Sequence, residues 1–155
     1  MTDKAKGMLL VILQFYFLIL LTVFAGTDQT GWGSLTVAIR VVGLILLVPA
    51  VYVVIAGLRG LGKALAANPV PRDEGELVTS GIYARMRHPI YSGLMLAGLA
   101  LVLQSGPMPH VLYWLALVVV LNVKVRFEER LLAAKYAGYH SYAAATPRFI
   151  PRLSR

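Results

Sequence analysis

The sequence predicts an all-α protein that crosses a membrane four times, with both termini in the cytoplasm and a cytoplasmic helix after the last span. Its composition is the first observation behind this fold class. Of 155 residues, 58% are hydrophobic and only 14% are charged, which is more apolar than a soluble domain of this length requires. The chain has no cysteine, which excludes disulfides, thiolate catalysis and cysteine metal sites.

Apolar segments are the second observation. A spanning helix needs about 20 apolar residues, and two segments meet that requirement. The other two are shorter and need flanking residues or protein surroundings to complete a crossing. In chain order, the four segments cover about 8–25, 35–58, 90–104 and 111–123. No polar linker separates two apolar cores, so we expect one compact unit.

The placement of the basic residues predicts the orientation. Every lysine and arginine except Arg40 lies before the first segment, between the second and third, or after the fourth, whereas the loops 26–34 and 105–110 contain none. By the positive-inside rule the basic regions are cytoplasmic. The net charge of +8 therefore indicates topology and affinity for anionic lipid headgroups, and not nucleic-acid binding. Arg40 lies near the outer end of its span, where its side chain can reach the interface.

Polar residues gather in "RMRHPIYSG", where the third span begins. Pro89 suits the first turn of a helix, which places His88 in the cap region beside Arg87. The free N–H groups of a first turn, together with basic side chains, favour an anion. Tyr83 and Tyr91 add flat apolar faces and hydroxyls. The alternative interpretation is that these residues are interfacial anchors, which are common at membrane boundaries.

A second polar cluster, "KVRFEERLL", follows the fourth span on the same predicted side of the membrane. Glu128 and Glu129 are adjacent, so on a helix they point about 100° apart and we expect them to have different partners. Arg126 lies three residues before Glu129 and could form a surface ion pair with it. Together, the two clusters could hold a zwitterion, with the basic cap binding a carboxylate and a glutamate binding an ammonium or ribose hydroxyls.

At these residues the chain resembles a known family. "LVTSGIYARMRHPIYSG" followed by "RFEERLL" and "TPRFIP", over about 77–153, resembles the isoprenylcysteine carboxyl methyltransferases and their phospholipid methyltransferase relatives. The resemblance implies an integral membrane enzyme that uses S-adenosylmethionine at a cytoplasmic site. The implied cofactor-binding residues are Tyr83, Arg87, His88, Pro89, Ile90, Tyr91 and Glu128. The implied catalytic residues are Arg126, for which Lys124 is an alternative, and Glu129.

The chemistry of methyl transfer suits these residue types. An in-line displacement requires alignment more than a strong acid or base, and a carboxylate acceptor is already ionised at neutral pH. An amine or thiol acceptor would have to lose a proton, for which Glu129 or His88 are candidates. We therefore predict a methyltransferase acting on an isoprenylcysteine-type carboxylate or a related lipophilic molecule, small or prenylated. The alternative is a non-enzymatic membrane scaffold or sensor subunit without cofactor affinity.

These inferences predict one membrane methyltransferase domain over 1–155, in a prokaryotic inner or cell membrane, with its active site facing the cytoplasm. No metal site is predicted, and the oligomeric state stays open. The predicted subdivisions are an amino-terminal two-span hairpin, 1–58, a cytoplasmic loop, 59–89, and a catalytic two-span hairpin with its cytoplasmic tail, 90–155.

Overall fold

The computed structural model describes residues 2–23, 31–62, 65, 69–70, 76–106 and 108–152, and the regular secondary structure in these ranges is helical, with no strand. The α-helices are α1 (Asp3–Val23), α2 (Thr36–Leu61), α3 (Pro89–Ser105), α4 (His110–Lys135) and α5 (Tyr139–Ala145). Two 3₁₀ turns, η1 (Gly33–Leu35) and η3 (Gly81–Ala84), precede α2 and α3. The all-α prediction is therefore confirmed. Positions 63–64, 66–68 and 71–75 of the predicted loop lie outside the described residues.

Three helices are long and apolar enough to cross a membrane: α1, α2 with its preceding turn, and α4. Helix α3 is apolar but has only 17 residues, or about 25 Å at about 1.5 Å per residue. That is slightly less than the roughly 30 Å hydrocarbon core of a bilayer. Large apolar side chains cover the outside of these helices, with Val37, Val48 and Tyr52 each about 70% exposed or more. Such a surface suits lipid, and the predicted multi-pass membrane fold is confirmed.

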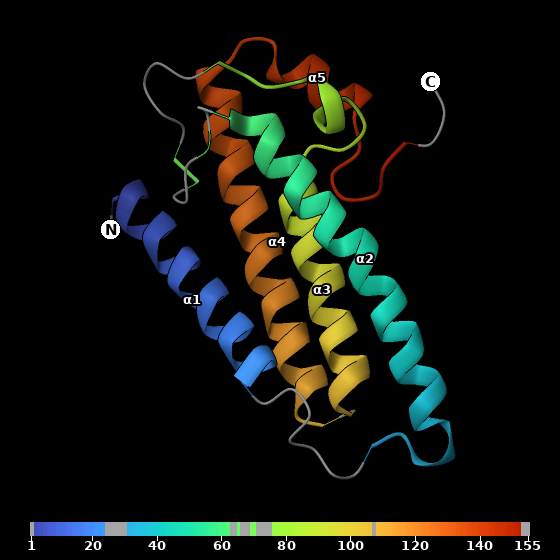
Figure 1. Cartoon of the computed structure of the whole chain (residues 1–155). Helices are drawn as coiled ribbons and strands as arrows, with labels where there is room; N and C mark the ends of the chain where they lie inside the picture. The colour runs from blue at the N-terminus through green and yellow to red at the C-terminus, as the bar shows by residue number, and fades with distance from the viewer. Residues whose placement is uncertain are drawn as a thin grey trace.

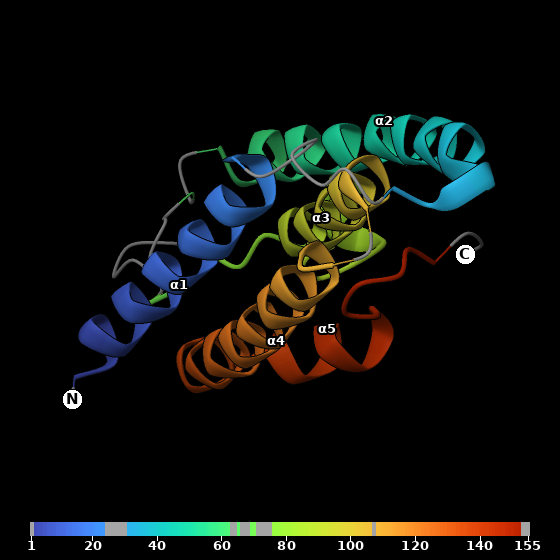
Figure 2. The same ribbon diagram turned by 90° about the horizontal axis from the view of Figure 1, so that it is seen from below.

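The long helices are ordered in space as α1, α4, α3 and α2 (Figure 1), since α1 packs on α4, α4 on α3 and α3 on α2. The two amino-terminal helices, which follow one another in sequence, therefore lie on opposite sides of the α3–α4 pair. The segment predicted as the hairpin 1–58 is thus divided between the two flanks of the bundle. Figure 2 shows the same arrangement from below, with α5 beside α4.

Small residues bring α2 and α3 close together. A Cβ atom added at Gly93 would come within 2.8 Å of the Ala50 carbonyl oxygen, and one added at Gly57 would come within 2.8 Å of an Ile90 side-chain carbon. Glycine at such points lets two helix backbones approach closely inside a membrane. This contact fixes the beginning of α3 against the end of α2, where the two polar motifs of the sequence meet.

The cytoplasmic helix predicted after the fourth span is a direct continuation of it. Helix α4 has 26 residues without interruption, or about 39 Å, and a turn at 137–138 leads into α5. The residues after α5 then fold back on the start of α3, and we call 146–152 the strap. The strap is joined to this region by backbone hydrogen bonds, in which Arg87 N–H donates to Pro147, His88 N–H to Arg148, and Arg152 N–H to Arg85.

Candidate active site

The first turn of α3 forms the centre of the site. Pro89 occupies the first helical position, as predicted, and His88 is the cap residue. Ser92 donates its hydroxyl to the His88 carbonyl at 3.0 Å and to the Phe149 carbonyl of the strap at 2.8 Å. Immediately upstream, η3 buries Tyr83, whose hydroxyl donates to the Gly57 carbonyl at 3.2 Å. The "GIYARMRHPIYSG" segment is therefore attached to both α2 and the strap.

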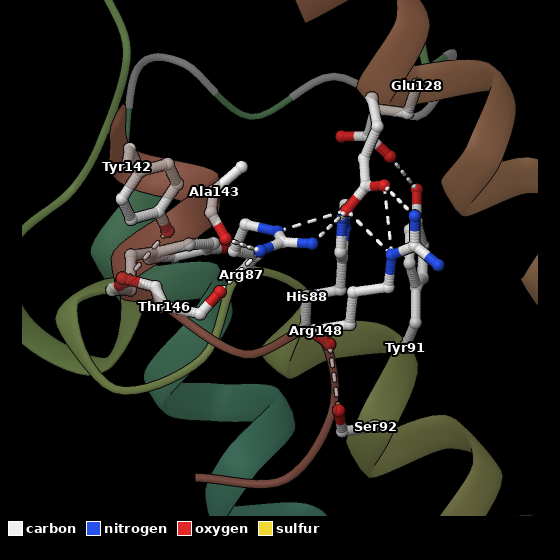
Figure 3. Close-up of polar contacts among 11 residues, drawn as sticks. Arg87, His88, Tyr91, Ser92, Glu128, Tyr142, Ala143, Thr146 and Arg148 are labelled. Carbon is white, nitrogen blue, oxygen red and sulfur yellow. Dashed lines mark hydrogen bonds and ion pairs between the residues drawn. The ribbon is translucent and has the colours of Figure 1, made fainter. Parts of the chain in front are cut away.

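Glu129 is the hub of an ion cluster, whose other members Arg87, His88 and Arg148 are labelled in Figure 3. Arg87 donates to its Oε1 from Nε at 3.0 Å and from Nη2 at 2.8 Å, while Arg148 donates to Oε2 from Nη2 at 2.6 Å. His88 Nε2 also lies 3.2 Å from Oε1. The third guanidinium nitrogen of Arg87 donates to the carbonyls of Ala143 and Thr146. Hydrogen bonds to Glu129 also raise the pKa of Arg148. Glu129 thus joins α4, the α3 cap and the strap.

Glu128 has different partners, as the 100° offset between adjacent helical residues predicts. Its Oε2 accepts a hydrogen bond of 2.7 Å from the Tyr91 hydroxyl. The Tyr91 ring in turn stacks on the His88 ring, with centroids 5.6 Å apart and planes 11° apart. Glu129 is therefore enclosed by arginines, whereas Glu128 is hydrogen-bonded to one ring of the His88–Tyr91 pair.

A cavity of about 320 Å³ lies next to this pair, between the four long helices. Its polar side includes Glu128 and the motif around His88, and its apolar side comes from α1, the end of α2 and Leu65. The lining residues are Val11, Gln14, Phe15, Leu58, Leu61, Leu65, Tyr83, Arg87, His88, Ile90, Tyr91, Lys124 and Glu128. Six of the seven predicted cofactor-binding residues line it. Pro89 is the exception, because it is buried where α3 begins.

Lys124 and Arg126, the two alternatives for the basic catalytic residue, are placed differently. Lys124 lies one turn before Glu128 on the same helix face, is 3% exposed and lines the cavity. Its Nζ donates to Gln14 Oε1 at 2.7 Å and lies 5.1 Å from the centroid of the Tyr91 ring. Arg126 is exposed and does not line the cavity, nor does the enclosed Glu129. The cavity therefore brings together Lys124 and Glu128 rather than Arg126 and Glu129.

Tyr142 attaches α5 to η3, and Tyr139 lies buried beside it, with the two ring centroids 6.2 Å apart. Tyr142 donates its hydroxyl to the Tyr83 carbonyl at 2.7 Å, and burial raises its pKa to about 12, so the hydroxyl stays protonated at neutral pH. Burial, together with the negative charge of Glu129, also raises the pKa of the Tyr139 hydroxyl. His140, between them, is exposed. Tyr142 thus stabilises Tyr83, which lines the cavity.

Two residues of the site were missed from sequence. Gln14 is the one amide side chain in the first apolar segment, and a polar residue within a span is by default a functional candidate. Arg148 was counted only as part of the basic tail, because its contact with Glu129 depends on the fold of the strap. No spacing pattern indicates that contact.

Comparison with known proteins shows the family to which the chain belongs. Over 85 residues the chain is 39% identical to the cobalt-zinc-cadmium resistance protein CzcN of Cupriavidus metallidurans and 35% identical to the nickel-cobalt-cadmium resistance protein NccN of Alcaligenes xylosoxydans xylosoxydans. Each match covers 54% of this chain but only 39% of the relative, so the chain matches about two fifths of these curated relatives. The phospholipid methyltransferase family matches residues 38–138, more than half of the chain. That range includes η3, α3, all of α4 and nearly all of α2, and the chain therefore belongs to the phospholipid methyltransferase family.

Proposed function

We propose that this protein transfers a methyl group from S-adenosylmethionine to a lipophilic carboxylate, such as an isoprenylcysteine-type molecule, at the cavity beside His88 and Tyr91. The main support for this proposal is that the cavity has a polar side and an apolar side. One side holds the acid, cation and aromatic rings of the two motifs, and the other is an apolar wall from α1 and α2. A cavity of this volume, with a few convergent polar groups, suits a small-molecule ligand.

The residues present fit the cofactor. S-adenosylmethionine supplies a methyl group activated by a sulfonium, and it also carries an ammonium, a carboxylate and ribose hydroxyls. Glu128 accepts a hydrogen bond from Tyr91, and a carboxylate has further lone pairs for an ammonium or hydroxyl. The stacked rings of His88 and Tyr91 offer a flat apolar surface. Arg87 contributes positive charge near the first turn of α3, where an anion is favoured.

Lys124 supports a carboxylate as the acceptor group. A carboxylate is ionised at neutral pH and requires orientation by a cation rather than deprotonation. The geometry of Glu129 agrees with this chemistry, because Oε1 accepts from two nitrogens of Arg87 and Oε2 from two nitrogens of Arg148. These bonds occupy the lone pairs that a base would need. We therefore assign Lys124 to orient the carboxylate of the acceptor, and Glu129 to position the residues around it. We assign Arg126 no contact with the reactants.

The proposed setting is a cell membrane, with the site at its cytoplasmic face. The basic motif residues Arg85 and Arg87 and the strap residues Arg148 and Arg152 gather at the end of the bundle where the cavity lies. Basic residues favour the cytoplasmic side of a membrane. The names of the two relatives refer to metal resistance and to no methyl acceptor, and the support for the acceptor class comes from the lining of the cavity.

Binding of the product S-adenosylhomocysteine tests the proposal. The purified protein in lipid nanodiscs is titrated with S-adenosylhomocysteine by calorimetry, and Glu128→Gln and Tyr91→Phe are compared with wild type. We expect each variant to bind at least tenfold more weakly, since charged hydrogen bonds contribute roughly 1.5–3 kcal/mol. Arg130→Gln is the control, because Arg130 is exposed and pairs with Asp3 away from the cavity. Wild-type protein that does not bind would favour the scaffold or sensor alternative.

A further inference from the structure

Helix α1 brings one polar side chain to the cavity from outside the part of the chain that the family matches. Gln14 is 7% exposed and belongs to the buried stripe of α1, which also contains Leu10, Val11 and Leu21. The family match begins at residue 38. The neighbouring side chains of Ile12 and Phe15 are apolar and exposed, so Gln14 is the polar side chain of the buried stripe.

That contact is with an ammonium that forms no ion pair with the nearby Glu128, one turn further along α4. Lys124 is 3% exposed, and among the described residues it forms no ion pair. Its Nζ has three N–H donors, of which Gln14 Oε1 accepts one at 2.7 Å. Glu128 lines the same cavity, but its hydrogen bond is with Tyr91. A buried cation that bonds only to a neutral amide and faces an aromatic ring still favours direct binding of an anion.

The lysine side chain is long and flexible, and it would take several positions without an anchor. Gln14 holds Nζ across the Tyr91 ring, at the boundary between the polar and apolar sides of the cavity. An acceptor with a charged head and an apolar chain would place its head at this boundary. Its chain would then lie along Val11 and Phe15 of α1, on the apolar side.

We infer that Gln14 is a positioning residue, which acts through Lys124 to orient the anionic head of the acceptor, and that α1 thereby sets acceptor selectivity. This inference rests on the proposed function. Methyl transfer to the acceptor forms an oxygen–carbon bond and breaks the sulfur–carbon bond, whose electron pair passes to sulfur. The products are a neutral ester and S-adenosylhomocysteine, and no proton moves. Gln14 and Lys124 therefore act on the orientation of the acceptor and not on its protonation.

The alternative is a purely structural role, in which Gln14 only attaches α1 to α4, since side-chain hydrogen bonds between helices stabilise membrane bundles. Gln14→Glu distinguishes the two roles. A carboxylate at this position still accepts from Lys124, and more strongly, because the bond becomes charge-assisted. The attachment of the helices is therefore kept, but the positive charge offered to an acceptor is neutralised.

The experiment measures binding of octanoate and of S-adenosylhomocysteine to nanodisc-embedded protein by equilibrium dialysis. For Gln14→Glu we expect octanoate affinity to fall at least tenfold, S-adenosylhomocysteine affinity to stay within twofold, and the melting temperature to be unchanged or higher. Octylamine, which has the same chain with a cationic head, should bind Gln14→Glu more tightly than wild type. Asn122→Asp is the matched control, because Asn122 bonds to the Val118 carbonyl of its own helix and does not line the cavity.

The inference is overturned if Gln14→Glu binds octanoate within twofold of wild type, since Gln14 is then only an interhelical contact. It is also overturned if wild type binds S-adenosylhomocysteine but not octanoate, a result that leaves the proposed methyltransferase activity standing. Wild type that fails to bind S-adenosylhomocysteine instead overturns the proposed function. If Gln14→Glu does not fold, Gln14→Met decides: we expect octanoate affinity to fall at least threefold, and an unchanged affinity contradicts the positioning role.

Discussion

Replacing Glu129 by glutamine should release the strap from the bundle. The side chains of Glu129 and Arg87 are 11% and 10% exposed, whereas that of Arg148 is 45% exposed. Removal of the carboxylate charge leaves Arg87 enclosed without its counterion, at a cost of about 2 kcal/mol. The exposed Arg148 contact adds at most about 1 kcal/mol. The total of about 3 kcal/mol corresponds to a roughly hundredfold larger population of the detached strap.

Limited trypsin digestion can measure this detachment, because the peptide bond after Arg148 becomes accessible when the strap leaves the α3 cap. We expect cleavage of Glu129→Gln after Arg148 to be at least tenfold faster than cleavage of wild type, when both are followed by intact-mass spectrometry. Glu128→Gln is the matched control, since its carboxylate bonds to Tyr91 and not to the strap. The reasoning is refuted if Glu129→Gln and wild type are cleaved at equal rates, or if the control is cleaved as fast as Glu129→Gln.

Two other predictions concern the surroundings of the site. Gly93→Val should lower stability by about 1–3 kcal/mol through overpacking, because an added Cβ already comes within 2.8 Å of the Ala50 carbonyl oxygen. The control Gly138→Ala, at a position with open space around it, should leave the melting temperature unchanged. Equal effects of the two substitutions would contradict the close approach of α2 and α3. Tyr142→Phe removes the hydrogen bond to the Tyr83 carbonyl and should cost about 1 kcal/mol. Because burial raises the Tyr142 pKa from 10.0 to about 12, this stabilisation is complete below pH 10 and is lost between pH 10 and 12. Melting temperatures of wild type and Tyr142→Phe at pH 8 and 11 check that sign, and a larger difference at pH 11 would contradict it.

The sequence was sufficient to predict which segments are helices, because long apolar runs and the preference of Pro89 for a first turn are local properties. It also predicted that Glu128 and Glu129 have different partners, since their 100° separation follows from helix geometry alone. The order of the helices in space could not be predicted in this way. That order depends on close contacts such as that of Gly93 with Ala50, and hydropathy carries no information about which apolar faces are complementary.

The candidate site shows the same division between local and long-range information. Six of the seven cofactor-binding residues predicted from the motifs line the cavity. Five of them lie in or shortly before the first turn of α3, and Glu128 lies on α4 beside that turn. The hydrogen bond of Lys124 to Gln14 joins positions 110 residues apart, and that of Arg148 to Glu129 depends on the return of the strap. Contacts of this kind are made by tertiary structure, and neither residue carries a spacing signal.

The pairing of α1 with α4 also has a consequence for the order of events during synthesis. Helix α1 is made before the other described helices, yet it packs mainly on α4, which follows α2 and α3 along the chain. In the two-stage view of membrane protein folding, helices insert independently and associate afterwards. Gln14 then enters the bilayer well before Lys124 exists, and its amide lacks its final partner until the ribosome has produced α4. Helix α1 therefore cannot take its final position until α4 has been made, and the cavity is complete only then.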